Sequence, residues 1–128
     1  MPEKHLYEYA VIRIVPRVER EEFINAGVIM YCGTLRFLEV KCTMPKDRLK
    51  AFGGGVLDIT EIETRLKAFE QVCKGGKEGG PIGQLPLVVR FRWLTASRST
   101  VVQTSKVHPG LCTDAKATLE MLYEQLVS

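Results

Sequence analysis

Residues 6–32 decide the fold, and they read LYEYAVIRIVP (6–16), RVERE (17–21) and EFINAGVIMYC (22–32). The first and third segments are rich in β-branched and aromatic residues, which favour strands, and the charged segment between them suits a turn. So short a connection is most simply made by an antiparallel hairpin. Because the second strand is apolar on both faces, we expect a covering layer on each side of the sheet. Gly27 inside that strand predicts a bulge or a close backbone approach.

Side chains alternate between the two faces of a strand, so segment 6–16 divides into two sets. A turn at Gly33-Thr34 and a third strand over residues 35–42 continue the pattern. The front of the chain therefore predicts a mainly antiparallel sheet that begins with a β-hairpin or a three-strand meander. The two faces of the first strand carry Ala10, Ile12 and Ile14 on one side and Tyr9, Val11, Arg13 and Val15 on the other.

Two main helices are predicted farther along the chain, at about residues 59–74 and 114–127. In each, apolar residues recur at the spacing that places them on one helix face. A capping residue precedes each helix, and the candidates are Asp58 or Thr60 for the first and Thr113 or Asp114 for the second. The apolar faces consist of Ile59, Ile62, Leu66, Phe69 and Cys73, and of Ala115, Leu119, Leu122 and Leu126.

The remaining segments are shorter. A short helix is expected over residues 45–52, because proline is well tolerated at a first helical position. Residues 75–83 (GGKEGGPIG) predict a flexible loop, and Pro109-Gly110 predicts a turn. Residues 86–94 suit either a short helix or a strand, and residues 99–107 (STVVQTSKV) predict a strand. Strands gathered at the front with helices after them favour an α+β fold over an alternating α/β fold.

The length and the apolar and charged fractions are those of an ordinary globular protein, and we expect one domain over residues 1–128. The net charge of +3 is too small to indicate a nucleic-acid partner by itself. The longest apolar run, residues 26–32, is too short to span a bilayer, and no signal peptide is recognised. The cysteines lack the close spacing of a zinc or redox motif, so no metal or cofactor is expected. We interpret Cys32, Cys42, Cys73 and Cys112 as reduced, mostly buried thiols of a cytoplasmic protein.

Residues 90–108 (RFRWLTASRSTVVQTSKVH) are basic, rich in hydroxyl groups and free of acidic residues. Arginine forks bind phosphates and carboxylates through paired bonds, and short hydroxyls with backbone N–H groups can complete an anion cradle. The alternative is a strand whose polar residues face solvent and whose arginines pair with acids elsewhere. The candidate donors are Arg90, Arg92, Arg98 and Lys106, together with Thr95, Ser97, Ser99 and Thr100.

A second polar group lies on the predicted hairpin, where Arg13, Glu22 and Asn25 can be neighbours across the strands. These residues form either a structural ion pair between Arg13 and Glu22 or one wall of a polar pocket. His108 is the one plausible general acid–base, and Cys112 follows it by four residues. The intervening Pro-Gly argues against a helical pairing of the two, so a histidine bonded to backbone at a turn is the default interpretation.

Three stretches resemble a bacterial family catalogued as domain of unknown function 3037. They are YEYAVIRIVPRVEREEFINAGVIMYC (7–32), FRWLTASRSTVVQTSKVHPGLC (91–112) and the closing helix. The resemblance covers most of the chain and is weakest through residues 43–84. It implies no established activity, but members are often encoded beside proteins resembling a HipA-like kinase, which implies such a kinase as a candidate partner. The family pattern often has proline where this chain has Ser97. The matching residues are Arg13, Glu22, Asn25 and Gly27, then Trp93, Thr95, Arg98, Ser99, Thr100, His108 and Gly110.

Three functions remain open from the sequence. The first is a non-enzymatic module that binds a protein partner through the surface of residues 90–108. The second is a domain or enzyme for a phosphorylated or carboxylated small molecule, in which Arg98 clamps the anion while Ser99 and Thr100 donate to it. The third is a nucleic-acid accessory protein with Trp93 as a stacking platform, although a tryptophan in an apolar run is more often part of the core. Each of these is compatible with self-association.

Overall fold

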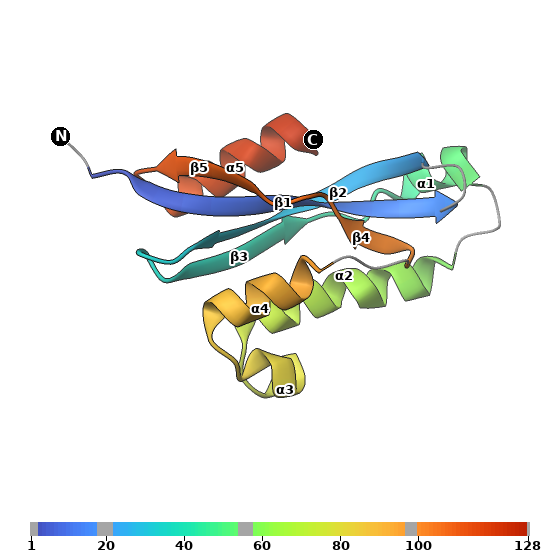
Figure 1. Cartoon of the computed structure of the whole chain (residues 1–128). Helices are drawn as coiled ribbons and strands as arrows, with labels where there is room; N and C mark the ends of the chain where they lie inside the picture. The colour runs from blue at the N-terminus through green and yellow to red at the C-terminus, as the bar shows by residue number, and fades with distance from the viewer. Residues whose placement is uncertain (1–2, 18–21, 54–57, 97–99, 128) are drawn as a thin grey trace.

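The computed structural model describes residues 3–17, 22–53, 58–96 and 100–127. It consists of an antiparallel sheet with α5 on one face and α2, α3 and α4 on the other (Figure 1). The predicted α+β fold is therefore confirmed. The elements are β1 (His5–Arg17), β2 (Glu22–Cys32), β3 (Phe37–Cys42), α1 (Lys46–Gly53), α2 (Ile59–Lys74), a 3-10 turn (Lys77–Gly79), α3 (Gly80–Gly83), α4 (Leu87–Leu94), β4 (Val102–Thr104), β5 (His108–Cys112) and α5 (Ala115–Leu126).

The sheet has the strand order β3-β2-β1-β4, and β5 also pairs with β1. The predicted hairpin is present as the antiparallel pair of β1 and β2, and β3 extends it into the predicted meander. Because β1 is long, it pairs with two short strands, β5 and β4, along the edge opposite β2. Residues 5–9 pair with β5, and residues 12–14 pair with β4.

A bulge in β2 confirms the interpretation of Gly27. Across β1, Ile12 pairs with Gly27 and Arg13 pairs with Asn25, so Ala26 has no residue opposite it. The extra residue shifts the alternation of side chains between the two faces of the sheet. As a result, Ile24 and Ile29 both contact the core under α2 although they are five residues apart. The close approach is also real, since a Cβ atom on Gly27 would lie 2.5 Å from the Cβ atom of Cys42 on β3.

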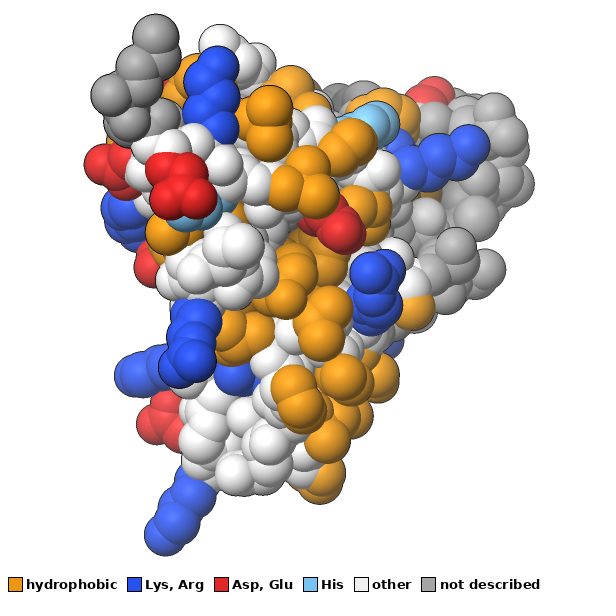
Figure 2. All heavy atoms as spheres, turned by 60° about the vertical axis from the view of Figure 1, so that its left-hand side comes forward, with side chains coloured by type: hydrophobic (Ala, Val, Ile, Leu, Met, Phe, Trp, Pro, Cys, Tyr) orange, Lys and Arg blue, Asp and Glu red, His pale blue; other side chains and the backbone are white. Residues whose placement is uncertain are grey.

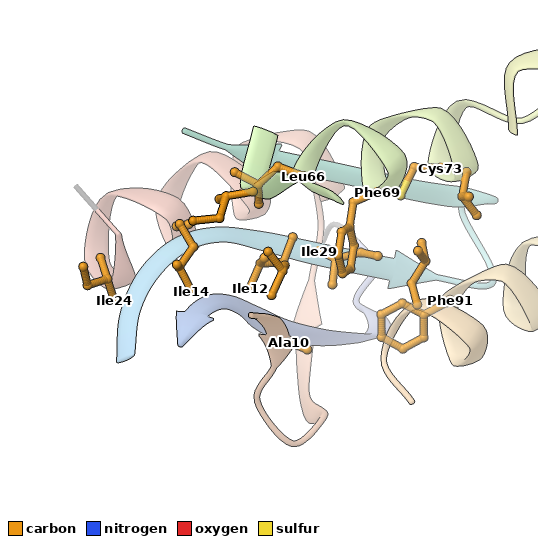
Figure 3. Packing of buried hydrophobic residues seen from close by; sticks show 14 of the residues in the cluster. Ala10, Ile12, Ile14, Ile24, Ile29, Leu66, Phe69, Cys73 and Phe91 are labelled. Carbon is orange, nitrogen blue, oxygen red and sulfur yellow. The ribbon is translucent and has the colours of Figure 1, made fainter. Parts of the chain in front are cut away.

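Two buried clusters hold the helices against the sheet, as the two-sided apolar pattern of β2 predicts. The cluster beneath α2 and α4 contains Ala10, Ile12 and Ile14, which were predicted to share one face of the first strand. Figure 3 shows Ile12 and Ile14 pointing toward Leu66 and Phe69 of α2. The cluster beneath α5 contains Tyr7, Val28, Met30, Cys32, Cys112, Ala115, Leu119, Leu122 and Val127.

The two main helices begin where their N-terminal caps predict. Asp58 accepts a hydrogen bond from the Glu61 N–H at the start of α2, and Asp114 accepts one from the Ala117 N–H at the start of α5. Gly75, at φ 78°, ends α2 in a backbone conformation that favours glycine. In the described part of the chain, no helix has the length and apolar content needed to cross a membrane.

Two predictions for the middle of the chain are corrected or decided. The flexible loop predicted over residues 75–83 is wrong, because it contains the 3-10 turn and α3, with proline in the first turn of α3. Of the two alternatives for residues 86–94, the helix is correct. Phe91 and Leu94 of α4 are buried, and the Phe91 ring stacks on Tyr31 with 5.5 Å between ring centroids.

The end of the chain departs further from the prediction. The strand predicted over residues 99–107 is confined to β4, and the predicted turn at Pro109-Gly110 is wrong because both residues lie in β5. Among the described strands β5 pairs with β1 alone, and an edge position tolerates the missing N–H of proline. Gly110 is needed for close packing, since a Cβ atom there would lie 2.4 Å from the Tyr7 ring.

Candidate functional site

The basic segment 90–108 does not form one anion cradle in the described part of the chain. It runs through the end of α4, the short β4 and the start of β5, so its side chains are distributed over several elements. Ser97, Arg98 and Ser99 lie outside the described residues. Thr100 directs its hydroxyl to the Val102 carbonyl at 2.6 Å, and Arg92 is exposed on α4.

Arg90 holds the end of α2. Its Nη1 donates to the carbonyls of Val72 at 2.9 Å and Cys73 at 3.1 Å, and its Nε donates to the Leu85 carbonyl at 2.9 Å. Carbonyls in the last turn of a helix have no partner within the helix, so a charged donor there stabilises the helix end. This arginine therefore has a structural role, which the sequence interpretation did not assign to it.

The polar group on the hairpin is brought together in part. Arg13 and Asn25 are partners across β1 and β2, whereas Glu22 lies opposite Arg17. The guanidinium carbon of Arg13 lies 4.1 Å from the centre of the Phe23 ring. The Nε of Arg13 and the Oδ1 of Asn25 are buried without a hydrogen-bond partner among the described residues. Two complementary polar atoms without partners on adjacent strands mark a position that a water molecule or a ligand group can complete.

A cavity of about 570 Å³ opens beside this pair, between β2, α1 and the end of α5. Asn25 reaches it while donating from Nδ2 to the Leu126 carbonyl at 2.9 Å. Arg48 of α1 contributes a positive charge to the wall, and Phe23 contributes apolar surface. The cavity thus combines the cation of Arg48, the amide groups of Asn25 and Gln125, and an apolar floor. Nothing local in the sequence links Arg48 to Asn25, because α1 and α5 bring them together.

The histidine and cysteine side chains are not arranged as a nucleophilic pair. His108 is exposed on β5 and packs against Tyr9, with 5.4 Å between the ring centroids. Cys112 lies four residues farther along the same extended strand, a separation of about 13 Å. Burial raises the pKa of the Cys112 thiol, and it raises the pKa of Cys42 and of Cys73 to about 12. These thiols are protonated at neutral pH and so are poor nucleophiles.

An exposed apolar surface is the feature that the sequence did not predict. Leu6 of β1 and Leu111 of β5 are cross-strand partners, with 60% and 62% of their surface exposed. They lie on the α2 and α4 side of the sheet. On α4, Val89 and Trp93 are exposed one turn apart, and the 43% exposure of Trp93 corrects the expectation that it belongs to the core. Figure 2 shows hydrophobic side chains running as a strip down this end of the molecule. We call Leu6, Leu111, Val89 and Trp93 the apolar surface.

The sequence reasoning missed this surface for a definite reason. Leu6 has the same strand parity as Ala10 and Ile12, which are buried, and Trp93 lies in an apolar run. Leu6 and Leu111 are exposed because the helices, α4 among them, do not cover these strand ends, and the sequence pattern does not show where a helix ends relative to the sheet.

The fold defines the chain as an α+β protein with helices on both faces of an antiparallel sheet. The family model described as "Protein of unknown function (DUF3037)" matches residues 9–127, so the chain belongs to this family. The resemblance noted in the sequence is thereby confirmed. No curated protein and no solved structure matches the chain.

Proposed function

We propose that the chain is a non-enzymatic, cytoplasmic module that binds a protein partner through the apolar surface. The observation that carries this proposal is the exposed cross-strand pair of Leu6 and Leu111, together with the exposure of Trp93 on α4. Large exposed apolar side chains that are grouped together are characteristic of protein-binding surfaces. Tryptophan is enriched among the residues that contribute most to binding energy.

Two further features support binding rather than catalysis. Arg90, the first residue of the basic segment, donates to three backbone carbonyls. The thiols of Cys42 and Cys73 are protonated at neutral pH because burial raises their pKa values to about 12. A HipA-like kinase, the partner that the family resemblance implies, is the first protein to test.

Replacing both leucines by serine is expected to weaken partner binding by at least about tenfold, because burial of a leucine side chain contributes roughly 1.5 kcal/mol or more. Binding of a HipA-like kinase from the same genome would be measured by calorimetry with the wild type and with the Leu6→Ser, Leu111→Ser variant. Met121→Ser is the matched control, because Met121 is 45% exposed but lies on α5. Equal affinity for the wild type and the double variant would refute the assignment of the apolar surface, and absence of binding by the wild type would refute this kinase as partner.

A second candidate function is the binding of a small phosphorylated or carboxylated molecule in the cavity beside Asn25. It is favoured by the buried Oδ1 of Asn25, which lacks a partner among the described residues, together with Arg48 in the same wall. Arg48 would take the anionic group, and a hydroxyl of the ligand would donate to Asn25. This arrangement places the anion site between β2 and α1 rather than on residues 90–108.

A ligand at one hundred times its dissociation constant is expected to raise the free energy of unfolding by about 2.7 kcal/mol. The measurement is a thermal-shift screen with inorganic phosphate, pyrophosphate, sugar phosphates and nucleotides. The shift should disappear in Arg48→Ala and persist in Lys50→Ala, which removes an exposed cation from the same helix. A shift that survives in Arg48→Ala, or no shift with any of these ligands, would eliminate the cavity as their binding site.

A further inference from the structure

Strand β3 lies at the border of the sheet and has a free outer edge in the described structure (Figure 1). The Thr43 N–H donates to the Ala26 carbonyl at 2.8 Å, one pair beyond the β2–β3 register. Hydrogen-bonded pairs alternate along an antiparallel ladder, so Lys41 and Glu39 also direct their backbone groups toward β2. The N–H and C=O groups of Leu38, Val40 and Cys42 therefore point outward, and no described backbone group accepts or donates to them.

There is space beside this edge. Two hollows of about 240 and 280 Å³ lie between β3 and α2, and Glu70 lines both of them. Leu38 and Val40 line one hollow and Cys42 lines the other. An unpaired strand edge bordered by open space is a template for an additional strand.

The side chains of β3 alternate in a pattern that complements itself. Leu38, Val40 and Cys42 face the core under α2, while Glu39 and Lys41 face α5. When two such strands run antiparallel about a two-fold axis at Val40, each Glu39 lies opposite the Lys41 of the other copy. In the same register Leu38 lies opposite Cys42, so apolar side chains meet on one face and opposite charges meet on the other.

We propose that two copies of the chain associate through β3 in this register and form one continuous sheet across the two-fold axis. The register also matches the backbone, since Val40 and its flanking even-numbered residues are those with outward N–H and C=O groups. A shift of the two-fold axis to Glu39 or to Lys41 would place like charges directly opposite each other, which is destabilising. The backbone and the charges therefore select the same arrangement.

Lysine on an edge strand ordinarily opposes the addition of another strand. Here Lys41 is paired with Glu120, and Glu39 accepts a hydrogen bond from Lys116 at 2.9 Å, so both charges are already balanced by α5. The second copy would extend these two ion pairs into one alternating network across the axis. This association is separate from the apolar surface and does not depend on partner binding.

The test uses charge reversal and sedimentation velocity over a range of protein concentrations. Wild type is expected to dimerise, and Glu39→Lys and Lys41→Glu are each expected to dimerise at least about tenfold more weakly because two like-charge pairs replace two opposite-charge pairs. An equimolar mixture of the two variants should recover dimers, since every cross-strand pair in the mixed dimer is again oppositely charged. Glu78→Lys, an exposed reversal remote from β3, should behave as wild type.

Recovery in the mixture separates loss of the interface from loss of the fold, because each variant also removes an ion pair to α5. Monomeric wild type at every concentration would overturn the proposal. Single variants that dimerise as wild type, or a mixture that stays monomeric, would overturn the proposed register.

Discussion

Gly27→Ala is expected to lower the free energy of unfolding by about 3 kcal/mol, which corresponds to a fall in Tm of roughly 10 °C for a domain of this size. The added Cβ atom would lie 2.5 Å from the Cβ atom of Cys42 and 2.8 Å from the Lys41 carbonyl. The second of these contacts is to backbone, so the strands must separate rather than a side chain turn away. Urea and thermal unfolding measure the effect.

The sign of this effect is informative, because alanine in place of glycine reduces the entropy of the unfolded chain and would otherwise stabilise the protein by about 0.4–1 kcal/mol. Adding Cys42→Gly to Gly27→Ala removes one of the close atoms and should recover part of the lost stability. A Gly27→Ala variant as stable as the wild type would show that β2 and β3 are not so close at this point.

Arg90→Ala is expected to lower the free energy of unfolding by about 3 kcal/mol, since hydrogen bonds from a charged donor contribute roughly 1.5–3 kcal/mol each and part of this arginine is solvated. The variant leaves the carbonyls of Val72 and Cys73 at the end of α2 without their donor. Arg90→Lys should lose most of the same stability, because an ammonium group does not reproduce the planar fork that spans three acceptors.

Arg92→Ala is the matched control, because Arg92 is exposed on the same helix and its removal should change stability by no more than about 0.5 kcal/mol. Unfolding in urea and partner binding should be measured on the same preparations. Normal stability in Arg90→Ala together with lost binding would show that Arg90 acts on a ligand or partner instead of supporting α2.

Local sequence patterns were sufficient to predict the strands and helices whose buried residues recur at regular strand or helix spacing. The alternation over residues 6–16 predicted which side chains of β1 share a face, and the spacing from Ile59 to Cys73 predicted α2 together with its buried face. Asp58 and Asp114, each one of two cap candidates, lie at the helix starts, and such caps are predictable because they are contacts between residues close in sequence. The proximity of Arg13 and Asn25 was likewise predictable, because a hairpin places these two residues opposite each other on adjacent strands.

The errors arose where a distant segment decides the local structure. Pro109-Gly110 has the composition of a turn, but pairing with β1 and the ring of Tyr7 hold it extended. The role of Arg90 depends on carbonyls 17 and 18 residues earlier in the chain, which no short pattern reveals. The exposure of Trp93 and the cavity beside Asn25 depend on where helices stop relative to the sheet, which is a property of tertiary packing.

The bulge at Ala26 has a consequence for changes in strand length. The apolar residues at even positions from Ile24 to Cys32 look like one continuous face, but the structure divides them between α2 and α5. The alternation of side chains between the two faces of the sheet is therefore shifted by one residue at Ala26. Deleting Ala26 alone would keep every other side chain of β2 on its present face. Deleting a residue beyond it would place the side chains of one half of the strand on the opposite face, so that the core residues of that half would point toward the wrong helix.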